Sequence, residues 1–275
     1  MKTAIVCEGG GMRGSYTAGV LQAFMEQGFG ADELVGVSAG ASNGVSYVSG
    51  QQQRGYRTNV DYAGDKRYAG LGNYLRTGSF FGMDFIFGEI PNRLDPFDYE
   101  AFAASPCLFF AGATDVETGR PFFFAKQQLT RECAILKASC SIPCLSPIVE
   151  IEGKKYLDGG VAAPIPIEKA LADGCERLVV VLTRHRGYVK KPQGFKAVYH
   201  QMYRRYPNLV KALDMRHLVY NHTLQKLWRL EAEGKAVVVA PKEPLLVDRF
   251  GKNREALAEA YRQGLQDGLA ALAFL

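Results

Sequence analysis

Residues 34–40 read Leu-Val-Gly-Val-Ser-Ala-Gly, a short apolar run followed by a serine between two glycines. The run predicts a buried strand over Leu34–Val37. Gly36 and Gly40 allow a sharp turn from this strand into a helix, so that the hydroxyl of Ser38 stands exposed. This arrangement favours a nucleophilic serine, although a plain turn rich in glycine and serine would have the same sequence.

A similar strand–turn–helix unit lies upstream. Thr3–Cys7 predicts a buried strand, Gly9–Gly14 a glycine-rich turn, and Ser15–Gln27 a helix with its apolar residues on one face. A helix can also form over Ala39–Ser49, so the chain opens on two such units in a row. Consecutive units of this kind predict parallel strands and an α/β fold.

The glycines of the upstream turn match G-x-G-x-x-G, the fingerprint of dinucleotide binding. That function needs an acidic residue at the end of the second strand, whereas Asp32 and Glu33 precede this strand. We favour an oxyanion hole, in which glycine N–H groups stabilise the negative charge of a tetrahedral intermediate. Arg13 could stabilise the loop, hold an anionic group or lie at the surface.

The rest of the chain alternates further strands and helices. Gln51–Pro106 has no clear periodicity and predicts loops with short helices, which could form a lid or a wall of a substrate site. Strands are expected at Cys107–Ala113, Pro121–Phe124, Ile148–Ile151, Lys154–Leu157, Arg177–Thr183 and Ala236–Ala240. Helices are expected at Leu129–Cys140, Ile167–Asp173, Asn208–Glu233 and Asn253–Leu272. No linker or repeat interrupts the pattern, so we expect residues 1–275 to form one domain.

Asp158 precedes two glycines, Gly159 and Gly160, directly after a predicted hairpin. An aspartate before glycines is most often a plain turn. Residues 138–143, however, read Ala-Ser-Cys-Ser-Ile-Pro, and a segment of this form precedes an Asp-Gly-Gly block in patatin-like enzymes. Four motifs thus follow one another in that family's order between residues 4 and 161. On these motifs the chain resembles the patatin-like family of serine acyl hydrolases.

The resemblance implies a three-layer α/β/α sandwich around a mainly parallel sheet, with the motifs within residues 3–183 and a basic helical region, a strand and a helix in 184–275. It also implies a catalytic dyad, with Ser38 as nucleophile and Asp158 as base. The backbone of Gly9, Gly10 and Gly11 would form the oxyanion hole, and the supporting motif positions would be Arg13, Gly14, Gly36, Gly40, Gly159 and Gly160. The implied reaction is hydrolysis of lipid esters of phospholipase A, lysophospholipase or esterase type, through an acyl-enzyme and without a cofactor or metal.

Two alternatives stay open. An α/β-hydrolase triad has the chain order Ser, Asp, His, which Ser38, Asp158 and His185 satisfy. His200, His217 and His222 are also available, but Ser38 comes early for that fold, after only the second strand. The chain could also be a membrane-associated binding protein that keeps the fold without turnover.

Composition is that of an ordinary globular protein, with 47% hydrophobic and 22% charged residues. No apolar run approaches the roughly 18 residues of a membrane span. The first eleven residues do not read as a signal peptide, because Glu8 and three glycines interrupt the apolar stretch. We therefore expect a cytoplasmic protein whose six cysteines are ordinary thiols, without a metal site.

A basic stretch lies beyond the motifs, between residues 184 and 216. Nine cationic residues there face one acidic residue, Asp214, and five aromatic residues lie among them. The nine are Arg184, Arg186, Lys190, Lys191, Lys196, Arg204, Arg205, Lys211 and Arg216. This pattern predicts contact with an anionic membrane surface, or else a solvated helical face. Because no recognition motif accompanies the charge, we expect no nucleic-acid partner.

Overall fold

The centre of the molecule is an eight-stranded sheet in the order β5-β6-β3-β2-β1-β7-β8, with β4 paired to β3. The computed structural model describes residues 1–275. The strands are β1 (Thr3–Cys7), β2 (Glu33–Val37), β3 (Leu108–Asp115), β4 (Pro121–Ala125), β5 (Val149–Ile151), β6 (Lys154–Asp158), β7 (Arg177–Val181) and β8 (Ala236–Val239). Five adjacent strands are parallel to one another, namely β3, β2, β1, β7 and β8. The pairings β3–β4, β3–β6 and β5–β6 are antiparallel. The predicted mainly parallel sheet is confirmed.

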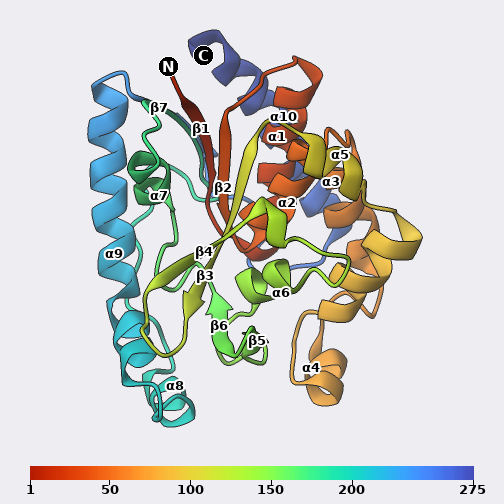
Figure 1. Cartoon of the computed structure of the whole chain (residues 1–275), viewed down its shortest axis with the longest axis vertical. Coiled ribbons are helices and arrows are strands. Elements are labelled where there is room, and N and C mark those ends of the chain that lie inside the picture. Colours follow the sequence, from red (N-terminus) through yellow and green to blue (C-terminus); the bar gives the residue numbers. More distant parts are fainter.

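Helices cover both faces of this sheet (Figure 1). On one face lie α1 (Gly14–Glu26), α2 (Ala39–Val48) and α10 (Arg254–Ala271), and on the other lie α7 (Ile167–Ala172) and α9 (Pro207–Ala232). Side chains of β1 alternate between the two hydrophobic cores. Ile5 belongs to the core that includes residues of α1, α2 and α10, and Val6 belongs to the core that includes residues of α7 and α9. Burial on both faces explains why the parallel strands read as continuous apolar runs. The predicted three-layer α/β/α arrangement is confirmed.

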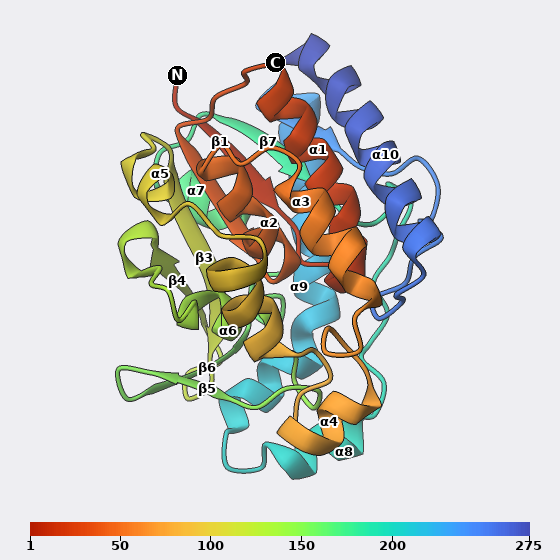
Figure 2. The same cartoon turned by 90° about the vertical axis from the view of Figure 1, so that its right-hand side faces the viewer.

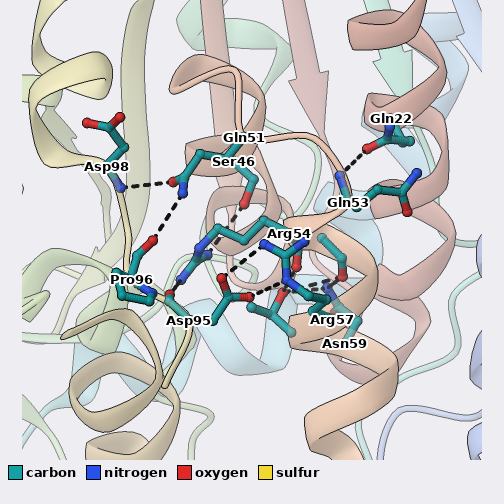
Figure 3. Close-up of polar contacts among 12 residues, drawn as sticks. Gln22, Ser46, Gln51, Gln53, Arg54, Arg57, Asn59, Asp95, Pro96 and Asp98 are labelled. Atoms are coloured by element: carbon teal, nitrogen blue, oxygen red, sulfur yellow. Dashed lines mark hydrogen bonds and ion pairs between the residues drawn. The ribbon is translucent and has the colours of Figure 1, made fainter. Parts of the chain in front are cut away.

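The segment between α2 and β3 is a chain of short helices. They are α3 (Arg54–Tyr56), η2 (Arg57–Asp61), η3 (Tyr62–Gly64), α4 (Leu71–Thr77), η4 (Phe85–Leu94) and α5 (Tyr99–Ala104). Figure 3 shows how Asp95 holds part of this segment together. Arg57 donates two hydrogen bonds to its carboxylate, at 2.8 and 3.0 Å, while Arg54 donates to its backbone oxygen at 3.4 Å. The segment is therefore tied by charged hydrogen bonds where its sequence lacks periodicity.

Several elements differ from the sequence prediction. The helix α6 (Ala134–Cys140) begins five residues late, because Cys133 has a left-handed φ of 50° that a helix interior excludes. The strand β7 ends before Thr183, whose N–H donates to the carboxylate of Glu8 at 2.6 Å instead of continuing the sheet. A short helix that the pattern did not predict, α8 (Lys196–Met202), precedes α9. The remaining short helices are η1 (Gly11–Arg13), η5 (Lys126–Gln128) and η6 (Leu272–Phe274).

The C-terminal part packs closely on the N-terminal part. Strand β8 extends the sheet beside β7, and α10 lies along α1, as Figure 2 shows. Two glycines permit this approach. A Cβ atom on Gly19 would lie 2.0 Å from the carbonyl oxygen of Tyr261, and one on Gly264 would lie 2.0 Å from that of Tyr16. We infer from this packing that residues 1–275 fold as one unit. None of the helices combines the length and the apolarity needed to cross a bilayer.

Replacing Gly264 with alanine should destabilise the protein, because the new methyl group would collide with the backbone of α1. Overpacking typically costs about 1–3 kcal/mol, and more where backbone must move, so the urea midpoint of unfolding should fall. Gly72→Ala in α4 is the matched control, since a Cβ atom there meets nothing within 4 Å. The control should be neutral or slightly stabilising. Equal midpoints for the two variants would contradict close packing of α1 on α10.

Candidate active site

Ser38 occupies a strained turn between β2 and α2. Its backbone angles are φ 54° and ψ −126°, a region that residues other than glycine rarely adopt. The flanking glycines make room for the turn. A Cβ atom on Gly36 would lie 2.5 Å from the nitrogen of Ala41, and one on Gly40 would lie 2.4 Å from the oxygen of Cys7. The serine thus sits at the carboxyl end of a parallel strand and at the N-terminus of a ten-residue helix.

Asp158 reaches the same place from the opposite direction. Along one edge of β3, strand β2 pairs as far as Val37, which lies opposite Gly112. From the next residue of β3 the same edge pairs with β6, and Asp158 lies opposite Ala113. The two strands therefore meet end to end, and the register brings Ser38 and Asp158 together although 120 residues of chain separate them.

Ser139 links the turn at Ser38 to β3, beside the end of β6. Its Oγ accepts a hydrogen bond from the Ser38 N–H at 2.8 Å and donates one to the oxygen of Gly112 at 2.7 Å. Two residues later the oxygen of Ser141 accepts the N–H of Asp158 at 2.8 Å. This bridge explains why the segment 138–143 accompanies the other two motifs. The sequence pointed to the segment but not to the contact that Ser139 makes.

The carboxylate of Asp158 is buried, with 2% of the residue exposed, and only one of its two oxygens accepts a hydrogen bond. Its Oδ1 accepts the N–H of Gly160 at 2.7 Å, whereas its Oδ2 is buried without a hydrogen-bond partner. Both Asp158 and Ser38 line one polar cavity. No hydrogen bond joins their side chains, and the free Oδ2 is available to accept one. Hydrogen bonds between catalytic groups often tighten only when substrate binds.

The glycine-rich loop before α1 lies against the serine. A Cβ atom on Gly9 would lie 3.2 Å from the Cβ atom of Ser38, so a larger residue would crowd this serine. The N–H groups of Gly9 and Gly10 donate no backbone hydrogen bond. Gly10 lines the polar cavity, and Gly11 lines a second, apolar cavity that also contains Ser38. Gly14 lets the starts of α1 and α2 approach, since its Cβ atom would lie 2.6 Å from that of Ala39.

Ser38 stands at the junction of two cavities with opposite chemistry. The apolar cavity has a volume of about 60 Å³, and its walls include Met12, Phe81, Ile86 and Phe87. A further cavity of about 40 Å³, lined mainly by hydrophobic residues, shares five lining residues with it and extends toward Phe97, Leu129 and Leu136. The segment between α2 and β3 supplies much of these walls. The site therefore offers an elongated apolar space on one side of the serine.

The polar cavity has a volume of about 80 Å³, and seven of its 14 lining residues are charged. Arg13 lines it and is 8% exposed, so the alternative of a surface arginine was wrong. Arg184, Lys190 and Arg216 line it too, although the sequence placed them in a stretch predicted to face a membrane. Arg249 joins them and was not singled out by any motif. These four residues come from distant parts of the chain, so no local pattern could indicate that they meet.

None of the four histidines lines either cavity that contains Ser38. His200 instead interacts with the carboxylate of Asp214, with Nε2 3.1 Å from the oxygens. All six cysteines are free. Cys140 lines the apolar cavity, where burial raises the pKa of its thiol and keeps it protonated. No group of three or more His, Cys, Asp or Glu side chains is arranged to hold a metal ion.

The family model for patatin-like phospholipases matches residues 5–171, which include all of the motifs described above. This match covers more than half of the chain, and the protein belongs to the patatin-like phospholipase family. A second family model, for a domain of unknown function (DUF6363), matches residues 206–275. Family membership supports a lipid hydrolase.

The chain is 26% identical over 270 residues to the uncharacterized protein YjjU of Escherichia coli K12, covering 96% of this chain and 75% of that protein. It is 29% identical over 193 residues to lysophospholipase NTE1 of Saccharomyces cerevisiae. That alignment covers 64% of this chain but 10% of the much longer yeast protein. Among solved structures, VipD from Legionella pneumophila aligns with 99% of this chain and 66% of its own, at a TM-score of 0.48 and 12% identity.

Ser139→Ala should lower kcat on a p-nitrophenyl ester about 10- to 100-fold with little change in KM, because displacement of a catalytic group by even 1 Å has effects of this size. Ser141→Ala is the matched control. The Ser141 hydroxyl is buried without a hydrogen-bond partner, so its loss should leave the rate near that of the wild type. Thermal melts of both variants check folding. Equal rate losses in the two variants would show that Ser139 does not position the nucleophile.

Proposed function

We propose that this protein is a serine acyl hydrolase that cleaves carboxylic esters of lipids through a Ser38–Asp158 dyad. The observation that carries the proposal is the position of Ser38 between an apolar cavity and a polar cavity lined by Asp158, whose Oδ2 has no hydrogen-bond partner. An ester of a fatty acid has the same division, with an apolar acyl chain on one side of the carbonyl and a polar alcohol on the other.

In the first half of the reaction, Ser38 Oγ attacks the ester carbonyl carbon and its proton passes to Asp158 Oδ2. The carbonyl oxygen becomes negatively charged and is stabilised by the free N–H groups of the Gly9–Gly11 loop. The alcohol then leaves with the proton from Asp158. In the second half, Asp158 takes a proton from water as the water attacks the acyl-enzyme, and the fatty acid leaves as Ser38 recovers its proton.

The acyl chain would occupy the two connected apolar cavities. Their walls come from apolar side chains on α2, α6 and the short helices before β3. Burial of each CH₂ group there contributes about 0.8 kcal/mol. A long acyl chain would therefore bind far better than a short one, which supports a lipid substrate over a small soluble ester. The yeast relative is named as a lysophospholipase, which agrees with this substrate class.

The arrangement favours a dyad over a triad, because no histidine lies in the cavities beside Ser38. The triad alternative would require one of the four histidines to move into contact with the serine. It also favours an enzyme over a binding protein without turnover. The strained backbone at Ser38 and the buried carboxylate oxygen without a partner both lower the stability of the fold. Catalysis gives a clear reason for keeping them.

A fluorophosphonate probe should label the wild type at one site, and Ser38→Ala should abolish labelling. Asp158→Asn should lower ester hydrolysis by at least about 100-fold, because general-base catalysis contributes roughly 10²–10⁴-fold. Labelling followed by peptide mass spectrometry checks the first result, and initial rates check the second. Labelling that persists in Ser38→Ala would exclude this serine as the nucleophile.

The histidines supply the control for the dyad. His185→Ala, His200→Ala, His217→Ala and His222→Ala, made one at a time, should each keep most of the activity. A folded histidine variant that loses several orders of magnitude would establish a triad instead.

We also propose that the end of the molecule near α8 contacts anionic membranes. Both views place α4 and α8 at the end opposite the chain termini (Figures 1 and 2). The exposed side chains there include Leu75, Phe195, Arg204 and Arg205. Arg186 and Lys196, by contrast, form ion pairs with Glu231 and Asp214, so the available basic surface is smaller than the sequence indicates.

Arg204→Gln combined with Arg205→Gln should weaken co-sedimentation with anionic vesicles, since each engaged basic residue contributes about 1 kcal/mol. The loss should be greatest at low salt. The matched control combines Arg229→Gln with Lys235→Gln, which removes the same charge near the opposite end of α9. Equal binding of the wild type to neutral and anionic vesicles would leave only a solvated basic face.

A further inference from the structure

Five cationic side chains converge on the polar cavity beside Ser38. They are Arg13, Arg184, Lys190, Arg216 and Arg249. They come from the glycine-rich loop, the segment after β7, the helix α9 and the loop before α10. The acidic groups in the same cavity are Glu8 and Asp158. The cavity therefore carries a clear excess of positive charge directly next to the nucleophile.

Ion pairs within the protein do not neutralise this charge. None of the five cations forms an ion pair, and the Nε of Arg13 is buried without a partner. Glu8 is occupied elsewhere. Its Oε2 accepts the N–H of Thr183 at 2.6 Å and the Thr183 hydroxyl at 3.1 Å, and its Oε1 accepts the Tyr220 hydroxyl at 2.9 Å. These hydrogen bonds use both oxygens of Glu8 to hold Thr183 and Tyr220 in place. Most of the positive charge in the cavity therefore has no ion-pair partner.

Other contacts fix the cations without cancelling them. Arg184 lies over the ring of Tyr188 at 4.4 Å, and Lys190 lies over that of Tyr220 at 4.9 Å. Arg216 donates to the backbone oxygen of Gly160 and to the side chain of Gln193 at 3.2 Å. Cation–π contacts and neutral acceptors hold a positive group in place while its charge remains free to attract an anion.

The crowding has an electrostatic consequence. Burial, with repulsion from Arg216, lowers the pKa of Lys190 to about 7. Burial lowers the pKa of Arg13 and of Arg249 to about 10, with repulsion from neighbouring arginines adding to it. Unpaired charges removed from water are unfavourable unless something compensates them. An anion bound among these groups would supply that compensation.

We propose that this cavity binds a phosphate group on the alcohol side of the scissile ester, so that the preferred substrate is an acylglycerol bearing a terminal phosphate. The proposal rests on the proposed ester hydrolase function. Glycerol separates its ester and phosphate oxygens by only a few bonds, and Ser38 lines the phosphate cavity itself. A phosphomonoester carries up to two negative charges, which suits several converging arginines. The ammonium group of a phosphocholine would instead meet uncompensated cations.

The origin of these residues gives the C-terminal part a role. Arg184, Lys190, Arg216 and Arg249 all lie beyond residue 171, where the patatin-like match ends. Arg216 and Arg249 lie within the match to the domain of unknown function. In this chain, that segment completes the wall of the cavity and selects the alcohol part of the substrate.

The test compares kcat/KM for three substrates with the same acyl chain: 1-acylglycerol 3-phosphate, 1-acylglycerophosphocholine and 1-monoacylglycerol. The phosphate ester should be preferred over each of the others by at least about 10-fold, the effect of one charge-assisted contact of about 1.4 kcal/mol. Arg249→Gln and Arg184→Gln should each reduce that preference about 10-fold. Arg229→Gln, an exposed arginine near the end of α9, is the matched control and should leave it unchanged.

The outcomes separate the two proposals. Cleavage of all three esters with equal kcat/KM, unchanged in both cavity variants, would overturn phosphate recognition and leave the hydrolase proposal intact.

If no ester is cleaved and no fluorophosphonate label forms, the hydrolase proposal is wrong. Binding to Ser38→Ala, measured by calorimetry, then still tests whether the cavity recognises a phosphate. Glycerol 3-phosphate should bind at least 10-fold more tightly than glycerophosphocholine or inorganic phosphate, and Arg249→Gln should remove that binding. Inorganic phosphate binding as tightly as glycerol 3-phosphate would identify a site for free phosphate and overturn the headgroup assignment.

Discussion

One edge of β3 is shared by two strands that run in opposite directions, and the candidate active site depends on that sharing. Strand β2 pairs with β3 as far as Gly112, and β6 takes over at Ala113. A sheet edge has one hydrogen-bonding register, so the ends of β2 and β6 must meet at a fixed place. Ser38 follows one end and Asp158 forms the other. Their proximity is a property of the sheet rather than of a flexible loop.

The joint between the two strands must also be held rigid, because Ser38 carries backbone strain of roughly 1–3 kcal/mol. The Ser139 side chain bonds to the backbone of Ser38 after β2 and of Gly112 in β3, and its carbonyl oxygen accepts the N–H of Gly159 just after β6. Gly36, Gly40 and Gly159 remove the Cβ atoms that would block the close approach of backbone. A serine held in this way loses little entropy when it attacks, which is the advantage of building a nucleophile on rigid elements.

The sequence indicated those features that depend on neighbouring residues. The apolar runs of β1, β2 and β7 follow from burial on both faces, and the glycines around Ser38 follow from the turn itself. It did not indicate the start of α6, because the left-handed residue there is a cysteine rather than a glycine. Nor did it indicate the bridge made by Ser139, which depends on the register of β3.

The basic stretch between residues 184 and 216 also shows what the local sequence cannot indicate. In the sequence, Arg184, Lys190 and Arg216 resemble Arg204 and Arg205, and all five read as surface charge. In the structure the first three turn into the cavity and the last two remain exposed. Which side of a chain segment faces inward is decided by α9 and the loop before α10. Local composition cannot report contacts of that kind.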